Sequence, residues 1–136
     1  MSATEPATIV TGVDFVSIPT RNLDRSVAFY GETLGLERSV YAPERNNAEF
    51  ETGTVTLSVY DPERMGIGEF KANANAISLH VEDVADARAT LEARGVTFLG
   101  DIIDTGVCHM AIFADPEGNA LMLHHRYAPR SVEPGR

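Results

Sequence analysis

The chain has 136 residues, the size of one domain, and carries 11 Lys and Arg against 20 Asp and Glu, a net charge of -9. Such an acidic surface repels phosphate backbones, so nucleic acid is not an expected partner. The sequence has no apolar run of about 18 residues and no secretory signal, so we expect no membrane span. A single cysteine excludes an intrachain disulfide and suits a reducing cytoplasm, where we expect the protein to reside.

Two segments of the chain, 13–36 and 74–96, share one pattern of apolar residues and helix caps when Ser17 is placed on Ser78. Each segment begins with residues that alternate between apolar and polar, which predicts a strand. The pattern indicates an internal repeat of one β-α unit, although two unrelated β-α units would give a similar match.

Helix caps follow each predicted first strand. Asn22 and Asp83 are residue types that cap helices, so we expect helices over 23–34 and 84–94. Gly95 then stands where a left-handed residue commonly ends a helix.

Three short strand-like runs follow each predicted helix, and DPEGN is a strong turn signal between the last two. Each half is therefore expected to be β-α-β-β-β. The predicted runs are 37–42, 47–52, 54–60, 96–102, 106–113 and 119–126. We expect one domain over 10–127, with module one at about 12–60, a linker at about 61–74, module two at about 75–127, and tails at 1–9 and 128–136.

Three segments in this order, FVSIPTRNLDRSVAFYGETLGL, ISLHVEDVADARATLEARGV and FADPEGNALML, resemble the vicinal oxygen chelate superfamily. That group includes glyoxalase I, bleomycin-resistance proteins, fosfomycin-resistance transferases and extradiol dioxygenases. The resemblance runs from about residue 12 to 127. It implies an α+β fold of two βαβββ modules, whose curved mixed sheets enclose a cavity. It also implies a homodimer, in which the modules could pair within one chain or across the two chains.

The resemblance also implies where catalytic members hold a divalent metal, using the first and last strands of each module. Carried onto this sequence, those slots fall on Phe15, Ala76 and Met122, with a further slot near Thr56. Phe and Ala offer no donor, a Met thioether is a weak one, and one Thr cannot hold an ion. We therefore expect no metal and no cofactor at these slots.

The adjacent histidines at the end of the last strand cannot both face the cavity, because successive side chains of a strand point to opposite faces. If Met122 faces inward, His124 also faces inward and His125 faces outward. His80 shares the inward parity of the second module. These histidines could line the wall as hydrogen-bonding groups, or His80 and His124 could form a displaced metal site with a carboxylate such as Glu49.

The expected ligand site combines apolar, polarizable side chains with scattered hydrogen-bonding groups, which suits an aromatic or flat organic molecule. Glu49 and Glu51 share one face of their strand and could meet a cation, act as a general base or be solvated. The predicted ligand-binding residues are Phe15, Ser17, Thr56, Ala76, Ser78, His80, Met110, Met122 and His124.

Two classes of function fit this sequence. The first is a metal-free protein that binds a small organic molecule, such as an aromatic or cationic antibiotic, without altering it. The second is an enzyme of the same superfamily, a lyase, isomerase or dioxygenase, with displaced metal ligands or a metal-free acid–base site. Because all expected ligands are missing from the slots, we favour the binding protein and predict no catalytic residue.

Overall fold

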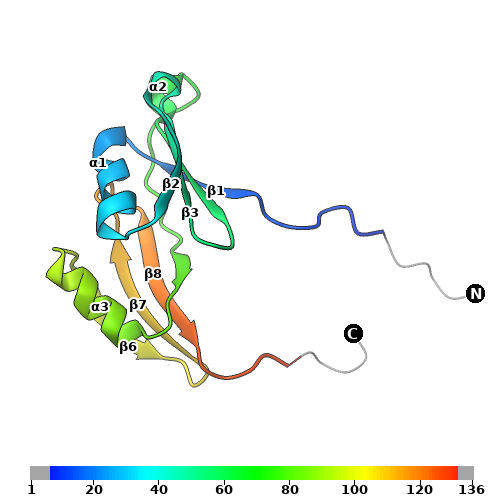
Figure 1. Ribbon diagram of the computed structural model, residues 1–136, viewed down its shortest axis with the longest axis vertical. Coiled ribbons are helices and arrows are strands. Elements are labelled where there is room, and N and C mark those ends of the chain that lie inside the picture. Colours follow the sequence, from blue (N-terminus) through cyan, green and yellow to red (C-terminus); the bar gives the residue numbers. More distant parts are fainter. Residues whose placement is uncertain (1–6, 132–136) are drawn as a thin grey trace, which may run out of the picture.

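A computed structural model describes residues 7–131, which form two four-stranded mixed sheets (Figure 1). The strand order is β1-β4-β3-β2 in one sheet and β5-β8-β7-β6 in the other. Module one consists of β1 (Phe15–Pro19), α1 (Leu23–Ala28), the π-helix η1 (Phe29–Thr33), β2 (Glu37–Ala42), the 3-10 helix η2 (Pro43–Arg45), β3 (Asn47–Glu51) and β4 (Thr56–Tyr60). Module two consists of β5 (Ile77–His80), α3 (Val84–Ala93), β6 (Phe98–Asp104), β7 (Cys108–Ala114) and β8 (Ala120–Arg126).

The first and last strands of each module run parallel and side by side, whereas the other neighbours are antiparallel. A parallel pair needs a crossover, and the helix after the first strand supplies it. The two predicted βαβββ modules are thereby confirmed, and the strands that follow each helix lie within two residues of their predicted ranges. The strand order leaves β1 and β5 at the edges of their sheets.

The helix caps form as predicted. Oδ1 of Asn22 accepts a hydrogen bond from the backbone N–H of Arg25, and Oδ1 of Asp83 accepts one from Asp86. Gly95 follows α3 with a φ of +92°, where a Cβ would be strained. The first helix differs from its prediction, because α1 ends at Ala28 and the chain widens into the π-helix η1 before turning.

The predicted linker 61–74 contains a short helix, α2 (Pro62–Met65), whose first turn is capped by Asp61. The predicted tails lie partly outside the described residues, at 1–6 and 132–136. The described part of the first tail and the residues up to Asp14 form an extended, exposed arm that leaves the body of the molecule (Figure 1).

The core lies between the sheets and their helices, which share one side of the molecule in Figure 1. Tyr30, Phe50 and Phe113 are its largest fully buried side chains. Within residues 7–131, no helix covers the opposite face of either sheet (Figure 1). The longest helix, α3, has 10 residues, and within residues 7–131 no helix is long and apolar enough to cross a membrane.

Candidate functional site: a groove between the two modules

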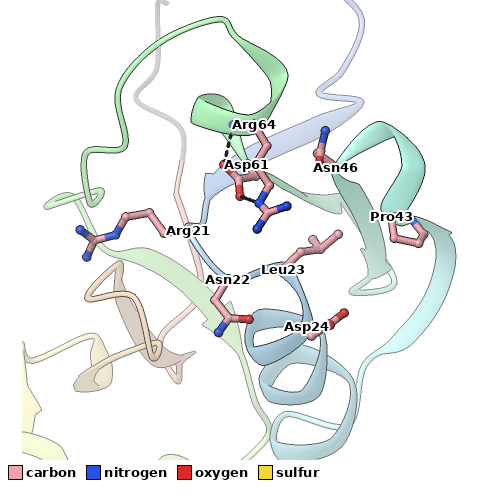
Figure 2. A pocket seen from close by; sticks show the side chains of 8 residues that line it. All are labelled: Arg21, Asn22, Leu23, Asp24, Pro43, Asn46, Asp61 and Arg64. Carbon is pink, nitrogen blue, oxygen red and sulfur yellow. Dashed lines mark hydrogen bonds and ion pairs between the residues drawn. The ribbon is translucent and has the colours of Figure 1, made fainter.

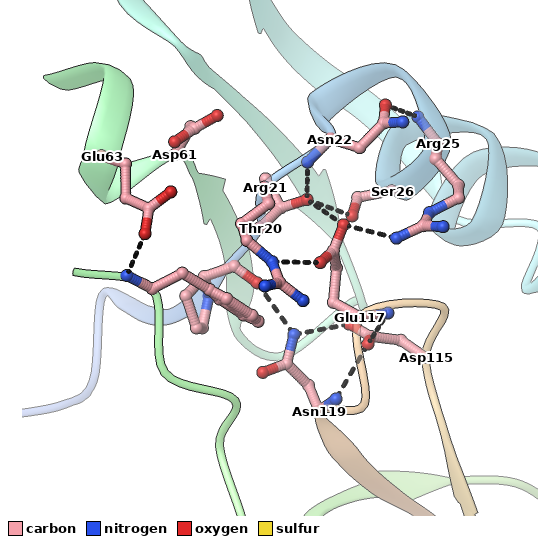
Figure 3. Close-up of polar contacts among 12 residues, drawn as sticks. Thr20, Arg21, Asn22, Arg25, Ser26, Asp61, Glu63, Asp115, Glu117 and Asn119 are labelled. Carbon is pink, nitrogen blue, oxygen red and sulfur yellow. Dashed lines mark hydrogen bonds and ion pairs between the residues drawn. The ribbon is translucent and has the colours of Figure 1, made fainter.

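The DPEGN turn joins the two modules. Oδ1 of Asp115 accepts the backbone N–H groups of Glu117 and Asn119, both at 2.9 Å, which closes the turn. Nδ2 of Asn119 donates to Oδ2 of Asp115 at 2.8 Å and to the carbonyl of Pro19 in module one at 2.9 Å (Figure 3). The hydroxyl of Tyr30, also in module one, donates to Oδ2 of Asp115 at 2.7 Å. The turn predicted from sequence is therefore also the contact that sets the position of one module against the other.

The carboxylate of Glu117 completes this junction, and its side chain is fully buried (Figure 3). Oε1 of Glu117 accepts hydrogen bonds from Nη2 of Arg25 at 2.9 Å and from Oγ1 of Thr20 at 3.1 Å. Burial raises the pKa of Glu117, but the hydrogen bonds from Arg25 and Thr20 outweigh it and the pKa is lowered overall. The carboxylate is thus held ionised between the modules.

A polar pocket of about 300 Å³ lies over the start of α1 and α2 (Figure 2). Its polar side chains are already used by the fold, because Asn22 caps α1 and Asp61 caps α2. Asp61 also pairs with Nε of Arg64 at 3.5 Å, as Figure 2 shows. Since these groups satisfy one another, the pocket offers a ligand few free partners.

A larger groove of about 560 Å³ lies between the edge strands β1 and β5, with α3 along one wall. Most of its lining is aliphatic and half-buried, from β1, β4, β5, β8, α3 and the turn that holds Leu34 and Leu36. The polar groups in its lining are Thr52, Thr54, Ser78, His80, Thr90 and Arg94. An apolar hollow with a few polar groups is the usual form of a small-molecule site.

The structure distributes the predicted ligand residues over both sheets. In module one, Phe15 pairs with Thr56 across β1 and β4, so both lie on the helix-free face, and Ser17 lies on that face two residues further along β1. Phe15 is 55% exposed there.

In module two, strand register places five of the predicted residues on one face: Ser78, His80, Met110, Met122 and His124. Ala76 precedes β5 and is half-buried. Of the nine predicted residues, only Ser78 and His80 also line the groove. No feature of the sequence pattern had indicated the groove itself. The use of these nine residues as a ligand site stays a prediction.

Glu51 lies in the same row as Phe15 and Thr56 across the helix-free face of sheet one. Its carboxylate accepts hydrogen bonds from Oγ of Ser39 and, at 2.6 Å, from Oγ1 of Thr56. These two bonds, that from Ser39 first, lower the pKa of Glu51. A carboxylate held ionised in this way suits a cation better than it suits general-base catalysis.

His80 lies at the end of β5, next to Glu82 and His125. Nε2 of His80 is 3.1 Å from Oε1 of Glu82, and the rings of His80 and His125 are 5.8 Å apart. The sequence-based alternative grouped His80 with His124 and Glu49, but Glu49 belongs to the other sheet. The alternation of side chains along a strand would place His80 and His125 on opposite faces of the sheet. The two rings meet because His80 ends its strand, and its exposed side chain is not held to one face.

A model of the family described as Glyoxalase/Bleomycin resistance protein/Dioxygenase superfamily matches residues 12–123. No curated protein matches the chain. Solved structures do match the chain, and the alignments cover most of its length. A member of the same superfamily from Sphaerobacter thermophilus DSM 20745 is 24% identical, with 86% of this chain and 98% of that chain covered and a TM-score of 0.74.

Two further solved structures differ in what they are described to do. TnmS3, an antibiotic binding protein from Streptomyces sp. CB03234, is 23% identical, with 88% and 99% covered and a TM-score of 0.73. A lactoylglutathione lyase from Agrobacterium tumefaciens is 17% identical, with 85% and 93% covered and a TM-score of 0.72. Structural similarity at these low sequence identities establishes the fold alone. Whether the protein binds a ligand or catalyses a reaction has to be argued from the residues of its site.

Proposed function

Because the chain belongs to the Glyoxalase/Bleomycin resistance protein/Dioxygenase superfamily, we propose that it binds a small organic molecule in the groove between its two modules. The observation that carries the proposal is the groove itself. Its volume of about 560 Å³ lies within the range of ligand pockets, and its lining is mostly aliphatic. The likeness to an antibiotic binding protein supports a ligand of antibiotic size.

The lining of the groove favours a neutral or anionic aromatic compound. Its polar groups are hydroxyls, the imidazole of His80 and the guanidinium of Arg94, and no carboxylate from residues 7–131 lines it. Nη1 of Arg94 donates to the carbonyl of Thr33 at 2.8 Å, which holds the cation at the rim. Of the two ligand types expected from sequence, the aromatic one fits the groove. A cationic ligand fits the helix-free face of sheet one better, beside Glu51.

Binding without turnover agrees with the residues at the family's metal slots. Phe15 and Ala76 have no donor atom in their side chains, and Met122 offers only a thioether. The low pKa of Glu51 weakens it as a general base. The slot residues therefore do not support an enzyme that holds its metal at the family's usual position, and Glu51 does not support a metal-free acid–base enzyme.

A thermal-shift screen of neutral, anionic and cationic aromatic compounds tests the proposal, because a ligand of the folded state raises the melting temperature. Thr90 is exposed and lines the groove, whereas Ala89 is exposed on the same helix and does not. We expect Thr90→Trp to fill the groove and abolish the shift, and Ala89→Trp to retain it. Equal shifts in both variants would place the ligand outside the groove.

We also propose that the protein is a homodimer in solution. The arm before β1 leaves three aliphatic side chains in water, with exposed fractions of 89% for Ile9, 78% for Val10 and 63% for Val13. Side chains of this kind in a row are typical of a surface that another chain covers. A dimer would also cover part of the open helix-free faces.

A further inference from the structure

We propose that His80, Glu82 and His125 bind one zinc ion at the end of β5. One ring nitrogen from each histidine and one carboxylate oxygen of Glu82 lie within 4.8 Å of one another. Two imidazoles and a carboxylate are a donor set that zinc accepts, with a fourth position left for water or a ligand. The proposal goes beyond the binding function above and departs from the sequence-based expectation of a metal-free protein.

The backbone around Val81 holds the three ligands together. The N–H of Val81 donates to the carbonyl of His124 at 3.0 Å, which pairs β5 with β8 beyond the end of β5. Nδ1 of His125 lies 3.1 Å from the carbonyl of Val81. Val81 stands between His80 and Glu82 in the chain, so one residue is tied twice to the strand that carries His125. The backbone positions of His80, Glu82 and His125 are therefore fixed relative to one another without a metal.

The hydrogen bond to Val81 also gives His125 the chemistry of a metal ligand. With its proton on Nδ1, the ring donates to the carbonyl of Val81 and leaves the lone pair of Nε2 free. Metal-binding histidines commonly have this arrangement, in which a backbone carbonyl fixes the tautomer and the ring plane. An isolated surface histidine has no such support.

The distances fit one tetrahedral ion after small movements. Zinc bonds of about 2.0–2.2 Å place neighbouring donors roughly 3.3–3.5 Å apart. Nε2 of His80 and Oε1 of Glu82, at 3.1 Å, are already near this separation. The widest pair lies no more than 4.8 Å apart, so it needs to close by at most about 1.5 Å. The side chains of His80 and Glu82 are 66% and 90% exposed and free to make that movement.

This site is separate from the family's metal slots at Phe15, Ala76 and Met122. His124 is paired with His80 in the strand register, yet among the described residues it does not belong to the cluster of possible ligands. His80 also lines the groove, so the ion would lie at the rim of the proposed ligand site. Zinc binding does not require the organic ligand, so each proposal can fail alone.

Calorimetric titration of tag-free, chelator-stripped protein with zinc chloride tests the site. We expect one ion per chain. His80→Ala, Glu82→Gln and His125→Asn should each weaken binding by at least about tenfold, and His125→Asn keeps a polar group facing the carbonyl of Val81. His124→Ala and His109→Ala should stay within about a factor of two of the wild type, because neither removes a proposed donor. Melting temperatures without zinc establish that each variant is folded.

Cobalt(II) gives a second readout, because a tetrahedral site of nitrogen and oxygen donors produces visible absorption bands that should vanish in His125→Asn. Absence of zinc binding in the wild type would overturn the proposal. An unchanged affinity in Glu82→Gln would overturn the three-ligand site. If His124→Ala lost as much zinc affinity as His80→Ala, the ion would lie on the face of the sheet that carries His124, opposite to His125. This result would equally overturn the proposal.

Discussion

The hydroxyl of Tyr30 donates a hydrogen bond of 2.7 Å to Oδ2 of Asp115, 85 residues further along the chain, and the contact is buried. Tyr30 lies in η1 of module one, and Asp115 begins the turn before the last strand of module two. Burial, followed by the nearby charge of Asp115, raises the pKa of Tyr30, so the phenol remains a donor. This bond links the packing of the core to the placement of the two modules and thus to the groove.

Removal of this donor should destabilise the protein. We expect Tyr30→Phe to lower the free energy of unfolding by roughly 1.5–3 kcal/mol, because a buried hydrogen bond to a charged group is lost. Tyr41→Phe is the matched control, since the hydroxyl of Tyr41 donates to Asp24 at 2.9 Å on the surface. Urea unfolding should show a lower midpoint for Tyr30→Phe alone. Equal midpoints in the two variants would contradict the role of the buried bond.

The stability of the junction should depend on pH through Glu117. Its pKa in the folded protein lies below the ordinary value of 4.5, so the folded state favours the ionised form more than the unfolded state does. That stabilisation is complete above the ordinary pKa and is lost as the pH falls through the folded pKa. Glu117→Gln should therefore be less stable than the wild type at neutral pH. The difference should shrink below about pH 4.5, as urea unfolding between pH 7 and 3 would measure. A difference that stays constant over this range would argue against the ionised pair.

The family's metal slots should be empty in protein purified without chelator. We expect the double variant His80→Ala, His125→Ala, purified tag-free and without chelator, to contain well under one divalent ion per chain. The reason is that Phe15, Ala76 and Met122 offer no hard donor. Elemental analysis for Zn, Mn, Ni and Fe measures this. A stoichiometric ion in the double variant would contradict this prediction.

A charge on the helix-free face separates the two candidate ligand positions. Met122 lies on that face and does not line the groove. We expect Met122→Glu to leave the affinity for a groove ligand unchanged, whereas a ligand seated over Phe15 and Met122, as the sequence predicted, should bind more weakly. Titration of any compound found in the thermal-shift screen measures the difference. A marked loss of affinity in Met122→Glu would show that the ligand binds on the helix-free face and not in the groove.

The arm before β1 should hold the dimer together. Sedimentation velocity of the wild type is expected to show a dimer, and Val10→Asp with Val13→Asp should shift it to a monomer, because charges would replace apolar contact. Thr11→Asp adds a charge between the same two positions at an exposed polar residue and should leave the dimer intact. A wild type that sediments as a monomer would contradict this assembly.

Much of the fold could be predicted from the sequence because its signals are local. Asn22 and Asp83 cap helices by hydrogen bonds that reach only three residues along the chain, and Gly95 tolerates a positive φ on its own account. The two modules follow from such signals repeated twice. The turn of residues 115–119 was equally readable. Its second role, as the joint between modules, was not, because Tyr30 in η1 and Pro19 in β1, the partners of Asp115 and Asn119 in module one, lie 85 and 100 residues away in the chain.

The sequence alone thus determined which side chains of a strand share a face, because strand residues alternate between the two faces. Tertiary structure decided which faces meet. The groove lies between the edge strands of two modules, and the hydrogen bonds of Asp115 and Glu117 that link those modules join residues far apart in the chain, so no local pattern encodes it. His80 and His125 meet because parity constrains a side chain within a strand and no longer constrains one at its end.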